Sequence, residues 1–437
     1  MRTDVVVVGG GQAGLAMSRV LSTAGLDHVV LERGEVAQSW RSERWDTLRL
    51  LTPNWMTRLP GWRYDGDDPD GYMNCAEVIA MLQRYREHIC APLLTHAPVQ
   101  RVTLRADGAF DVGTDSGSWQ ASAVVVASGA CSDPHLPACA IDLPPSIVQM
   151  TATEYRNPQQ LPDGPVLVVG ASASGVQIAD EVRGSGREVT IAIGEHVRVP
   201  RTYRGRDIHW WMDAIGLLDE RHDGVDDIER ARRVASLQLI GSPQRRDLDL
   251  QALLCAGVRP VGKLMRVSST IMQFSGGVGH LVANADLKMH RLLERIDDHI
   301  DQHDLGDVVG PPARPGRTHL GHVPTDVSVS AIRSVVWATG YRPRLPWLDR
   351  RAFDRRGRID HDGGVGSMPG VFVLGLPFLR RRKSNFIDGV GPDAHELVGH
   401  VVAHVRGGTH RDAALSGVER PAEQRRADTL DCLHERP

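Results

Sequence analysis

Two glycine-rich segments constrain this chain more than any other feature. The first is VVVVGGGQAG at Val5–Gly14, and the second is VLVVGASASG at Val166–Gly175. Each follows a run of apolar, mostly β-branched residues, as the phosphate-binding turn of a dinucleotide-binding βαβ unit does. One such segment predicts one dinucleotide site. Two in one chain predict two dinucleotides, and the ordinary reason is electron transfer between a nicotinamide and a flavin.

The first segment has the full spacing Gly9-x-Gly11-x-x-Gly14. Gly9 permits a tight turn, Gly11 lets the backbone approach a pyrophosphate, and Gly14 lets the following helix pack closely on the strand. We expect that helix to present its N-terminus to the pyrophosphate. The next strand, expected at 29–32, ends on Glu32, an acid at the position that normally holds a ribose hydroxyl pair.

The second segment reads Gly170-x-Ser172-x-Ser174-Gly175, with serine in place of the middle glycine. After the strand expected at 188–193 come Glu195 and then arginines at 198, 201, 204 and 206. A guanidinium near the ribose favours a 2′-phosphate and therefore NADPH over NADH, and we assign this role to Arg198 and Arg201. Two alternatives stay open: the arginines form a solvated basic loop, or Glu195 holds an unphosphorylated ribose.

Other parts of the chain predict further elements. Residues 40–75 are rich in Trp, Pro and Gly, which indicates either a long structured loop over a pocket or plain aromatic packing. We expect a helix at 77–88, a hairpin of 99–104 with 110–112, and buried strands at 123–127, 335–338 and 371–374. We also expect a later helix capped by Asn284 or Asp286. Its apolar face would carry Met289, Leu292, Leu293, Ile296 and Ile300.

Composition excludes several classes of protein. With 41% apolar and 24% charged residues and a net charge of −3, the chain is typical of a soluble globular protein with no polyanionic partner such as nucleic acid. No apolar run approaches the roughly 20 residues that span a bilayer, and the start leaves no room for a signal peptide. The six cysteines form no C-x-x-C pair, and no cysteine–histidine spacing predicts a metal site. We expect a cytoplasmic protein that is not a flavin disulfide reductase.

Several other segments resemble class B flavin-dependent monooxygenases, in particular flavin-containing monooxygenases and the bacterial CzcO-like flavoproteins. VWATGYRP at 336–343 resembles their A-T-G-Y motif, and Ala127-Ser128-Gly129 resembles their first A-T-G linker, with serine for threonine. Segments 45–50 and 59–61 resemble the region after the first βαβ unit, and YRNP at 155–158 resembles the residues before the NADPH fingerprint. Together these segments cover most of the chain in the family's order.

The chain also departs from the family. The F-x-G-x-x-x-H-x-x-x-Y/F signature would end on Tyr155, which places Pro145, Ile147 and Thr151 where the family has phenylalanine, glycine and histidine. The asparagine near the flavin aligns with Leu51 unless Asn54 takes its role. These departures bear on the oxygenation step rather than on the fold.

The resemblance implies an α/β fold class with two Rossmann-like dinucleotide-binding domains, arranged as in glutathione reductase. The ranges expected are 1–160 for the first part of the FAD-binding domain, 161–340 for an inserted NAD(P)H-binding domain, 341–410 for the second part of the FAD-binding domain, and 411–437 for a polar tail. FAD is placed at the N-terminal fingerprint by analogy with two-domain flavoproteins.

The resemblance further implies a monooxygenase mechanism. NADPH reduces FAD, reduced flavin captures O₂ as a C4a-hydroperoxide, and oxygen passes to a small organic substrate at an N or S heteroatom or a carbonyl. Asn54 and Asp388 are the catalytic residues assigned, Asp388 because it lies at the start of a helix whose dipole stabilises reduced flavin. The cofactor-binding residues assigned are Gly9, Gly11, Gln12, Ala13, Gly14, Glu32, Arg33, Trp40, Ser128, Gly129, Gly170, Ser172, Ser174, Gly175, Arg198, Arg201, Thr339, Gly340 and Asp388.

Two other readings of the sequence stay open. One is an NAD(P)H oxidase or reductase that passes electrons to a quinone or to O₂. The other is a non-catalytic flavin redox sensor or regulator of a transport system, against which the complete second fingerprint argues. The sequence does not fix the oligomeric state and leaves a homodimer open.

Overall fold

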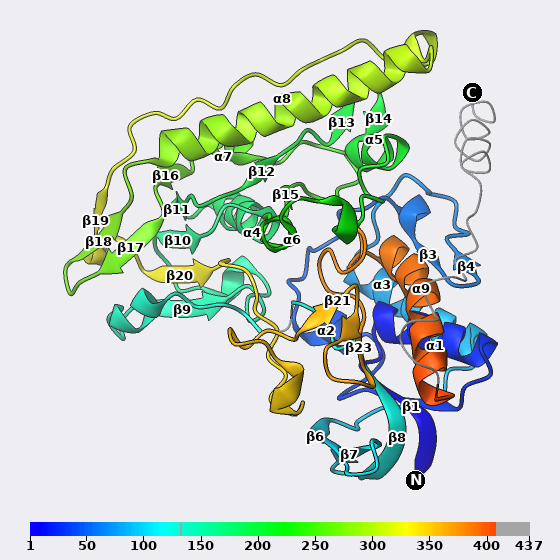
Figure 1. Ribbon diagram of the computed structural model, residues 1–437. Helices are drawn as coiled ribbons and strands as arrows, with labels where there is room; N and C mark the ends of the chain where they lie inside the picture. Colours follow the sequence, from blue (N-terminus) through cyan, green and yellow to red (C-terminus); the bar gives the residue numbers. More distant parts are fainter. Residues whose placement is uncertain (132, 408–437) are drawn as a thin grey trace.

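The computed structural model describes residues 1–131 and 133–407, and within them the chain forms two α/β units that lie side by side (Figure 1). The predicted tail 411–437 lies outside the described residues. Each unit is built on a parallel sheet, in the order β23-β8-β1-β2-β5 in the first and β16-β11-β10-β20-β9 in the second. The predicted fold class is therefore confirmed.

The first sheet is centred on β1 and gains two antiparallel extensions on the β8 side, β22 with β21 next to β23 and β7 with β6 next to β8. Val5–Val8 of β1 pairs in parallel with His28–Leu31 on one side and Ala123–Val126 on the other. Because Val5–Val8 of β1 are covered on both faces, these four residues are all apolar, as the sequence predicted. The strands are β1 (Arg2–Val8), β2 (His28–Leu31), β5 (Leu93–Leu94), β6 (Val99–Leu104), β7 (Phe110–Thr114), β8 (Gly117–Val126), β21 (His361–Asp362), β22 (Val365–Gly366) and β23 (Val371–Val373).

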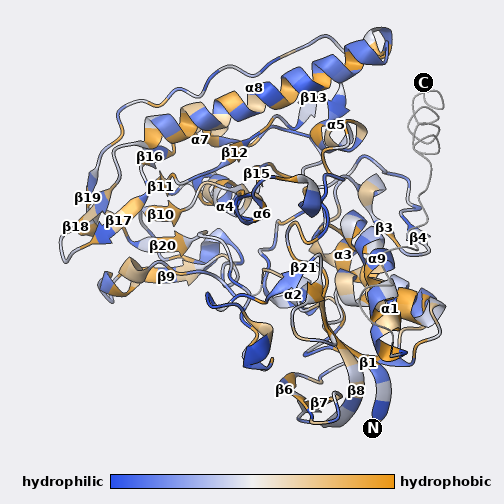
Figure 2. Ribbon diagram, in the orientation of Figure 1, coloured by the Kyte–Doolittle hydropathy of each residue, from blue (hydrophilic) through white to orange (hydrophobic). Residues whose placement is uncertain are grey.

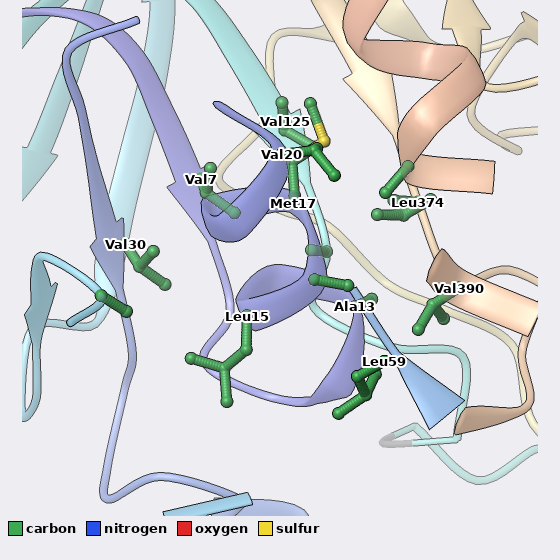
Figure 3. Close-up of a cluster of buried hydrophobic side chains, with 14 of the residues drawn as sticks. Val7, Ala13, Leu15, Met17, Val20, Val30, Leu59, Val125, Leu374 and Val390 are labelled. Carbon is green, nitrogen blue, oxygen red and sulfur yellow. The ribbon is translucent and has the colours of Figure 1, made fainter. Parts of the chain in front are cut away.

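Three helices pack on the first sheet, and they are α1 (Gln12–Thr23), α3 (Cys75–His88) and α9 (Ile387–Val405). Figure 3 shows the core they share, with Met17 and Val20 of α1 between the sheet and the C-terminal part of the chain. Leu374 and Val390 enter the same core from that C-terminal part. The last helix of the described residues, α9, therefore completes the unit that the first strand begins.

The second unit is inserted into the first. Its sheet contains β9 (Val148–Thr151), β10 (Val166–Val169), β11 (Val189–Ala192), β16 (Arg259–Val261) and β20 (Ser334–Trp337), and the chain then returns to the first sheet, where β23 pairs in parallel with β8. The edge strand β9 lies before residue 161, although it pairs with β20. Placing the domain boundary ahead of Val148 is our proposal, and the ranges 1–160, 161–340 and 341–410 stay predictions.

The long helix of the second unit differs from its prediction at the N-terminus. Helix α8 runs over Val278–Gln302 and begins after Gly277, so the prediction that Asn284 or Asp286 caps it is wrong. Asp286 lies inside the helix instead, where its buried side chain accepts hydrogen bonds from Arg198 and Thr318. The apolar stripe was placed correctly, with Met289, Leu293, Ile296 and Ile300 buried; Figure 2 shows the alternation of hydrophobic and hydrophilic residues along α8.

The remaining elements are short. The hairpin of β6 with β7 is confirmed, and 40–75 is mostly irregular, as predicted.

Among the described residues, no helix is both long and apolar enough to cross a membrane. The other helices and strands are α2 (Gln38–Ser42), β3 (Arg58–Leu59), β4 (Trp62–Arg63), α4 (Ala173–Gly184), β12 (Val197–Arg198), β13 (Thr202–Tyr203), β14 (Arg206–Asp207), α5 (Ile208–Ala214), α6 (Ile228–Arg232), β15 (Leu237–Gln238), α7 (Leu250–Cys255), β17 (Leu264–Val267), β18 (Ile271–Phe274) and β19 (Asp326–Ser328).

Candidate functional site

The first fingerprint, Gly9–Gly14, joins β1 to α1 in a turn that needs glycine at two positions. Gly9 has φ +112°, and a Cβ there would lie 2.5 Å from the carbonyl oxygen of Ala127. A Cβ on Gly14 would lie 1.8 Å from the carbonyl oxygen of Gly9. At Gly11, by contrast, a Cβ would meet no described atom within 4 Å. The backbone is therefore closely packed below the turn and open above it, where a pyrophosphate would lie.

The N-terminus of α1 is also available to an anion. Gly11 is its N-cap residue, and no described side chain caps the helix there. The amide groups of the first turn, which include Ala13, point towards this open space at the positive end of the helix dipole. Uncapped amides beside an open glycine fit the pyrophosphate of a dinucleotide. Gln12, at the first position of α1, lies at the same place.

Glu32 lies directly beside the first fingerprint. Its carboxylate accepts hydrogen bonds from the amides of Gly10 at 2.6 Å and Gly34 at 3.1 Å, and the residue is 7% exposed. This fixed carboxylate follows β2, where the sequence predicts a ribose ligand. The next residue, Arg33, is exposed and forms an ion pair with Glu43.

The second fingerprint, Gly170–Gly175, repeats the geometry of the first. Gly170 has φ +115°, and a Cβ there would lie 2.2 Å from the carbonyl oxygen of Ala338. A Cβ on Gly175 would lie 1.9 Å from the carbonyl oxygen of Gly170. Ser172 takes the place of Gly11 as N-cap of α4, and no described side chain caps that helix. The residues present therefore fit a second dinucleotide.

The segments that connect the two units pair with each other. We call 127–137 the first linker and 338–343 the second linker. The amide of His135 donates to the carbonyl of Gly340 at 2.9 Å, and the amide of Arg342 donates to the carbonyl of Asp133 at 2.9 Å. The hydroxyl of Thr339 also donates to the carbonyl of His135. The two linkers thus form one antiparallel connection between the units.

Both linkers begin with the same local turn. Gly129 follows Ser128 with φ +82°, and Gly340 follows Thr339 with φ +83°. Each turn comes directly after the alanine whose carbonyl packs on the first glycine of a fingerprint. The duplication therefore extends from the fingerprints into the linkers that the sequence assigned to cofactor binding.

Arg198 and Arg201 have internal partners. Arg198 is 4% exposed and donates to Asp249 at 2.6 Å and to Asp286 at 2.7 Å. Arg201 is fully buried and donates to Asp207 at 3.0 Å and to the carbonyl of Leu51 at 2.9 Å. Both guanidinium groups therefore have a structural role, and their assignment to a 2′-phosphate stays a prediction. Glu195 is exposed and lies three residues after the end of β11 (Val189–Ala192).

Comparison with known proteins identifies the family. Residues 6–207 match the family described as pyridine nucleotide-disulphide oxidoreductase. An uncharacterized CzcO-like oxidoreductase of Geobacillus kaustophilus (strain HTA426) is 31% identical over 405 residues, covering 92% of this chain and 99% of the relative. The chain belongs to the CzcO-like oxidoreductases. The predicted resemblance to class B flavin monooxygenases is confirmed at the level of family and fold.

Solved structures share the fold of this chain. It is similar to a flavin-containing monooxygenase from Stenotrophomonas maltophilia, with a TM-score of 0.63, 23% identity and coverage of 92% of this chain and 99% of the other. It is also similar to OTEMO in complex with FAD and NADP, with a TM-score of 0.53, 13% identity and coverage of 93% and 86%. At these identities the likeness shows the fold.

No disulfide forms among the described cysteines of this CzcO-like oxidoreductase, which are Cys75, Cys90, Cys131, Cys139 and Cys255. Cys432 lies outside the described residues. The expectation that the chain is not a flavin disulfide reductase stays a prediction.

Asn54 is held by backbone groups on both sides of its amide. Its Oδ1 accepts from the amide of Met73 at 2.9 Å, and its Nδ2 donates to the carbonyl of Asp68 at 2.8 Å. The residue is 5% exposed. This arrangement gives Asn54 a role in shaping the loop 68–73, and its catalytic assignment stays a prediction.

Asp388 lies in the first turn of α9, where the sequence placed it. Its side chain is 3% exposed and accepts from the guanidinium of Arg58 and from Lys383, whose Nζ is 3.0 Å away. Burial would raise the pKa of Asp388, but the hydrogen bond from Arg58 and the charge of Lys383 lower it. Asp388 is therefore a buried carboxylate, and sequence reasoning missed both of its partners.

The tryptophan-rich segment packs against both units, a position that the sequence did not predict. Trp40, on α2, is partly buried and packs against the core of each unit. The same segment contacts α4 through Thr47, which donates to Glu181 at 3.2 Å. Tyr155, the one matching residue of the family signature, is fully buried and donates to Glu181 at 3.0 Å.

Proposed function

We propose that this chain is an FAD-dependent monooxygenase that uses NADPH and O₂ and acts on a small organic substrate at an N or S heteroatom or a carbonyl. The duplicated glycine turn carries the proposal. Two open, uncapped helix N-termini follow two strands, and a paired connection joins the units that contain them. An enzyme that moves electrons from one dinucleotide to another needs this arrangement.

The roles of the chain's own residues follow from their positions. Gly9, Gly11 and Gly14 would hold the pyrophosphate of FAD against α1, with Glu32 beside the ribose. Gly170, Ser172 and Gly175 would hold NADPH against α4 in the same way. FAD bound there supplies hydride acceptance and reaction with O₂, neither of which a side chain supplies.

Exclusion of water is the protein's other contribution. An enzyme that passes oxygen to a substrate must keep the reduced cofactor dry, because water access favours release of peroxide. Trp40 and the segment 40–62 pack between the two units and would cover this region. We assign this segment the covering role.

A second candidate is an NAD(P)H oxidase or reductase. Thr151 stands where the family signature has histidine, and its amide and hydroxyl both bond to Glu154 at 2.8 Å. Thr151 is buried with this partner, so it offers no group to a bound cofactor. This observation favours a chain that reduces O₂ or a quinone without transferring oxygen to a substrate.

Isotope incorporation separates the two candidates. The purified protein with FAD is turned over with NADPH under ¹⁸O₂ in the presence of a panel of small amines, sulfides and ketones. Incorporation of one ¹⁸O atom into a product, coupled to NADPH oxidation, supports the monooxygenase. Recovery of all consumed O₂ as hydrogen peroxide with every compound would overturn it in favour of the oxidase.

A further inference from the structure

Lys383 is a buried ammonium group surrounded by three carboxylates. Its side chain is 7% exposed, and its Nζ lies 3.0 Å from Asp388, 3.4 Å from Asp219 and 3.5 Å from Asp213. Arg58 adds a second cation, bonded to Asp388 and 3.7 Å from Asp213. We call these five residues the Lys383 cluster. Only Asp388 among the five was assigned a role from the sequence; the other four have none in the proposed chemistry.

The Lys383 cluster connects the two units. Arg58, Lys383 and Asp388 belong to the first unit, on β3 and around the start of α9. Asp213 lies on α5 and Asp219 shortly after it, both in the inserted unit. The contacts therefore cross from one unit to the other at a place separate in sequence from both linkers.

The residue type suits this position. Of the 51 basic residues in the chain, the lysines are Lys263, Lys288 and Lys383, and the others are arginines. An ammonium is a compact charge with three donors that can point to three separate carboxylates, whereas a guanidinium is a planar fork. Burial lowers the pKa of Lys383, but Asp388, Asp213 and Asp219 raise it above its ordinary value, so the group stays charged.

The short helix α5 is attached to the first unit at its other end too. Its N-cap residue, Asp207, accepts from the hydroxyl of Tyr72 at 2.5 Å. Asp207 also accepts from Arg201, whose guanidinium donates to the carbonyl of Leu51 at 2.9 Å. Both ends of α5 are thus attached to the first unit, in addition to the paired linkers and the contacts of Trp40 and Thr47.

We propose that Lys383 is a positioning residue that holds the coenzyme-binding unit against the flavin-binding unit and thereby sets the rate of hydride transfer. The inference rests on the proposed function, because it needs a coenzyme on α4 and a flavin on α1. Hydride donor and acceptor react when they are about 3–3.5 Å apart, and a displacement of about 1 Å costs on the order of 100-fold in rate. Lys383 acts through this distance and not on the reacting atoms.

Single-turnover kinetics test the proposal. The variant Lys383→Met is loaded with FAD and reduced anaerobically with saturating NADPH in a stopped-flow instrument. We expect the reduction rate constant to fall at least tenfold, while the dissociation constant for FAD and the rate at which O₂ reoxidises the chemically reduced enzyme stay within twofold. Lys288→Met, at an exposed site on α8, is the matched control and should match the wild type.

Variants on the opposite side of the interface make the test specific. Asp213→Asn should slow reduction in the same way, and the double variant should be no slower than Lys383→Met alone. Lys383→Arg should not restore the rate, because the larger, planar guanidinium does not superimpose on the compact ammonium in this buried position. An unchanged reduction rate in both Lys383→Met and Asp213→Asn would overturn the proposal.

Lysine labelling gives a readout that does not depend on activity. Acylation of the wild-type protein, followed by mass spectrometry, should modify exposed Lys263 and Lys288 at least tenfold faster than Lys383. Asp213→Asn should speed labelling of Lys383 alone. Equal labelling of all three lysines in the wild type would overturn the interdomain contact.

Failure of the proposed function can be distinguished from failure of the positioning role of Lys383. A wild-type protein that neither NADPH nor NADH reduces would contradict the proposed function and the kinetic half of the inference. Slow acylation of Lys383 would then still establish the contact between the units. Fast acylation of Lys383 would contradict that contact as well.

Discussion

The carboxylate of Glu32 accepts a 2.6 Å hydrogen bond from the backbone amide of Gly10, so the acid and the glycine turn form one rigid surface. Glu32→Ala removes this contact and the proposed ribose ligand together. Hydrogen bonds to a charged group are worth about 1.5–3 kcal/mol, so we expect FAD to bind roughly 10- to 100-fold more weakly. Titration of the apoprotein with FAD measures this. Glu35→Ala, at an exposed residue nearby, is the control, and equal FAD affinity in the two variants would contradict the assignment.

The glycines of the first fingerprint predict two different defects. Gly11→Ala places a methyl group in open space, so the melting temperature of the apoprotein should not change while FAD binding is lost. Gly14→Ala drives a methyl group into the carbonyl of Gly9 and should destabilise the fold itself by about 1–3 kcal/mol. Thermal denaturation without FAD, followed by FAD titration, separates the effects. Full FAD binding by Gly11→Ala would show that no pyrophosphate lies there.

We expect substitution of Arg198 to lower the stability of the fold without changing the preference between NADPH and NADH. Arg198→Met leaves Asp249 and Asp286 buried without their cation, which costs about 3–5 kcal/mol. We expect the dissociation constants for NADPH and NADH to change by the same factor, as measured by fluorescence titration. A loss confined to NADPH would instead support the sequence-based assignment of Arg198 to the 2′-phosphate.

We expect the interactions of Asp207 to make the folded protein less stable in acid. Burial opposes its ionisation, but the hydrogen bond from His209 and the charge of Arg201 lower its pKa from 3.8 to about 2. Because the folded pKa lies below the unfolded value, this contribution of about 2 kcal/mol is present above pH 3.8 and is lost as the pH falls towards 2. Thermal denaturation across this range should show a shallower decline in Asp207→Asn. Parallel curves for the variant and the wild type would refute the prediction.

Local sequence was enough to predict the two fingerprints and the core strands. Val5–Val8 and Val166–Val169 are buried on both faces, and a glycine turn follows each within a few residues, so neighbours in sequence carry the whole signal. The start of α8 was missed because Gly277 and Val278 carry no capping residue. A pattern of apolar residues predicts the face of a helix well and its end poorly.

The candidate site was predictable only in part. The glycines that form the two turns could be predicted, since their spacing reflects backbone geometry, and their contact with a pyrophosphate stays a prediction. It could not show that Arg198 and Arg201 are buried, because their partners lie up to about 150 residues away. The Lys383 cluster was missed for the same reason, although the scarcity of lysine, at three of 51 basic residues, was a visible signal.

Reaction of the reduced enzyme with O₂ tests the central claim most directly. The protein is reduced anaerobically with NADPH in the presence of FAD and mixed with O₂ in a stopped-flow spectrometer. The account predicts an oxygenated flavin spectrum that outlives mixing and lasts longer when NADP⁺ is bound. Immediate return of oxidised flavin with one hydrogen peroxide per flavin, with and without NADP⁺ and every substrate offered, would contradict it.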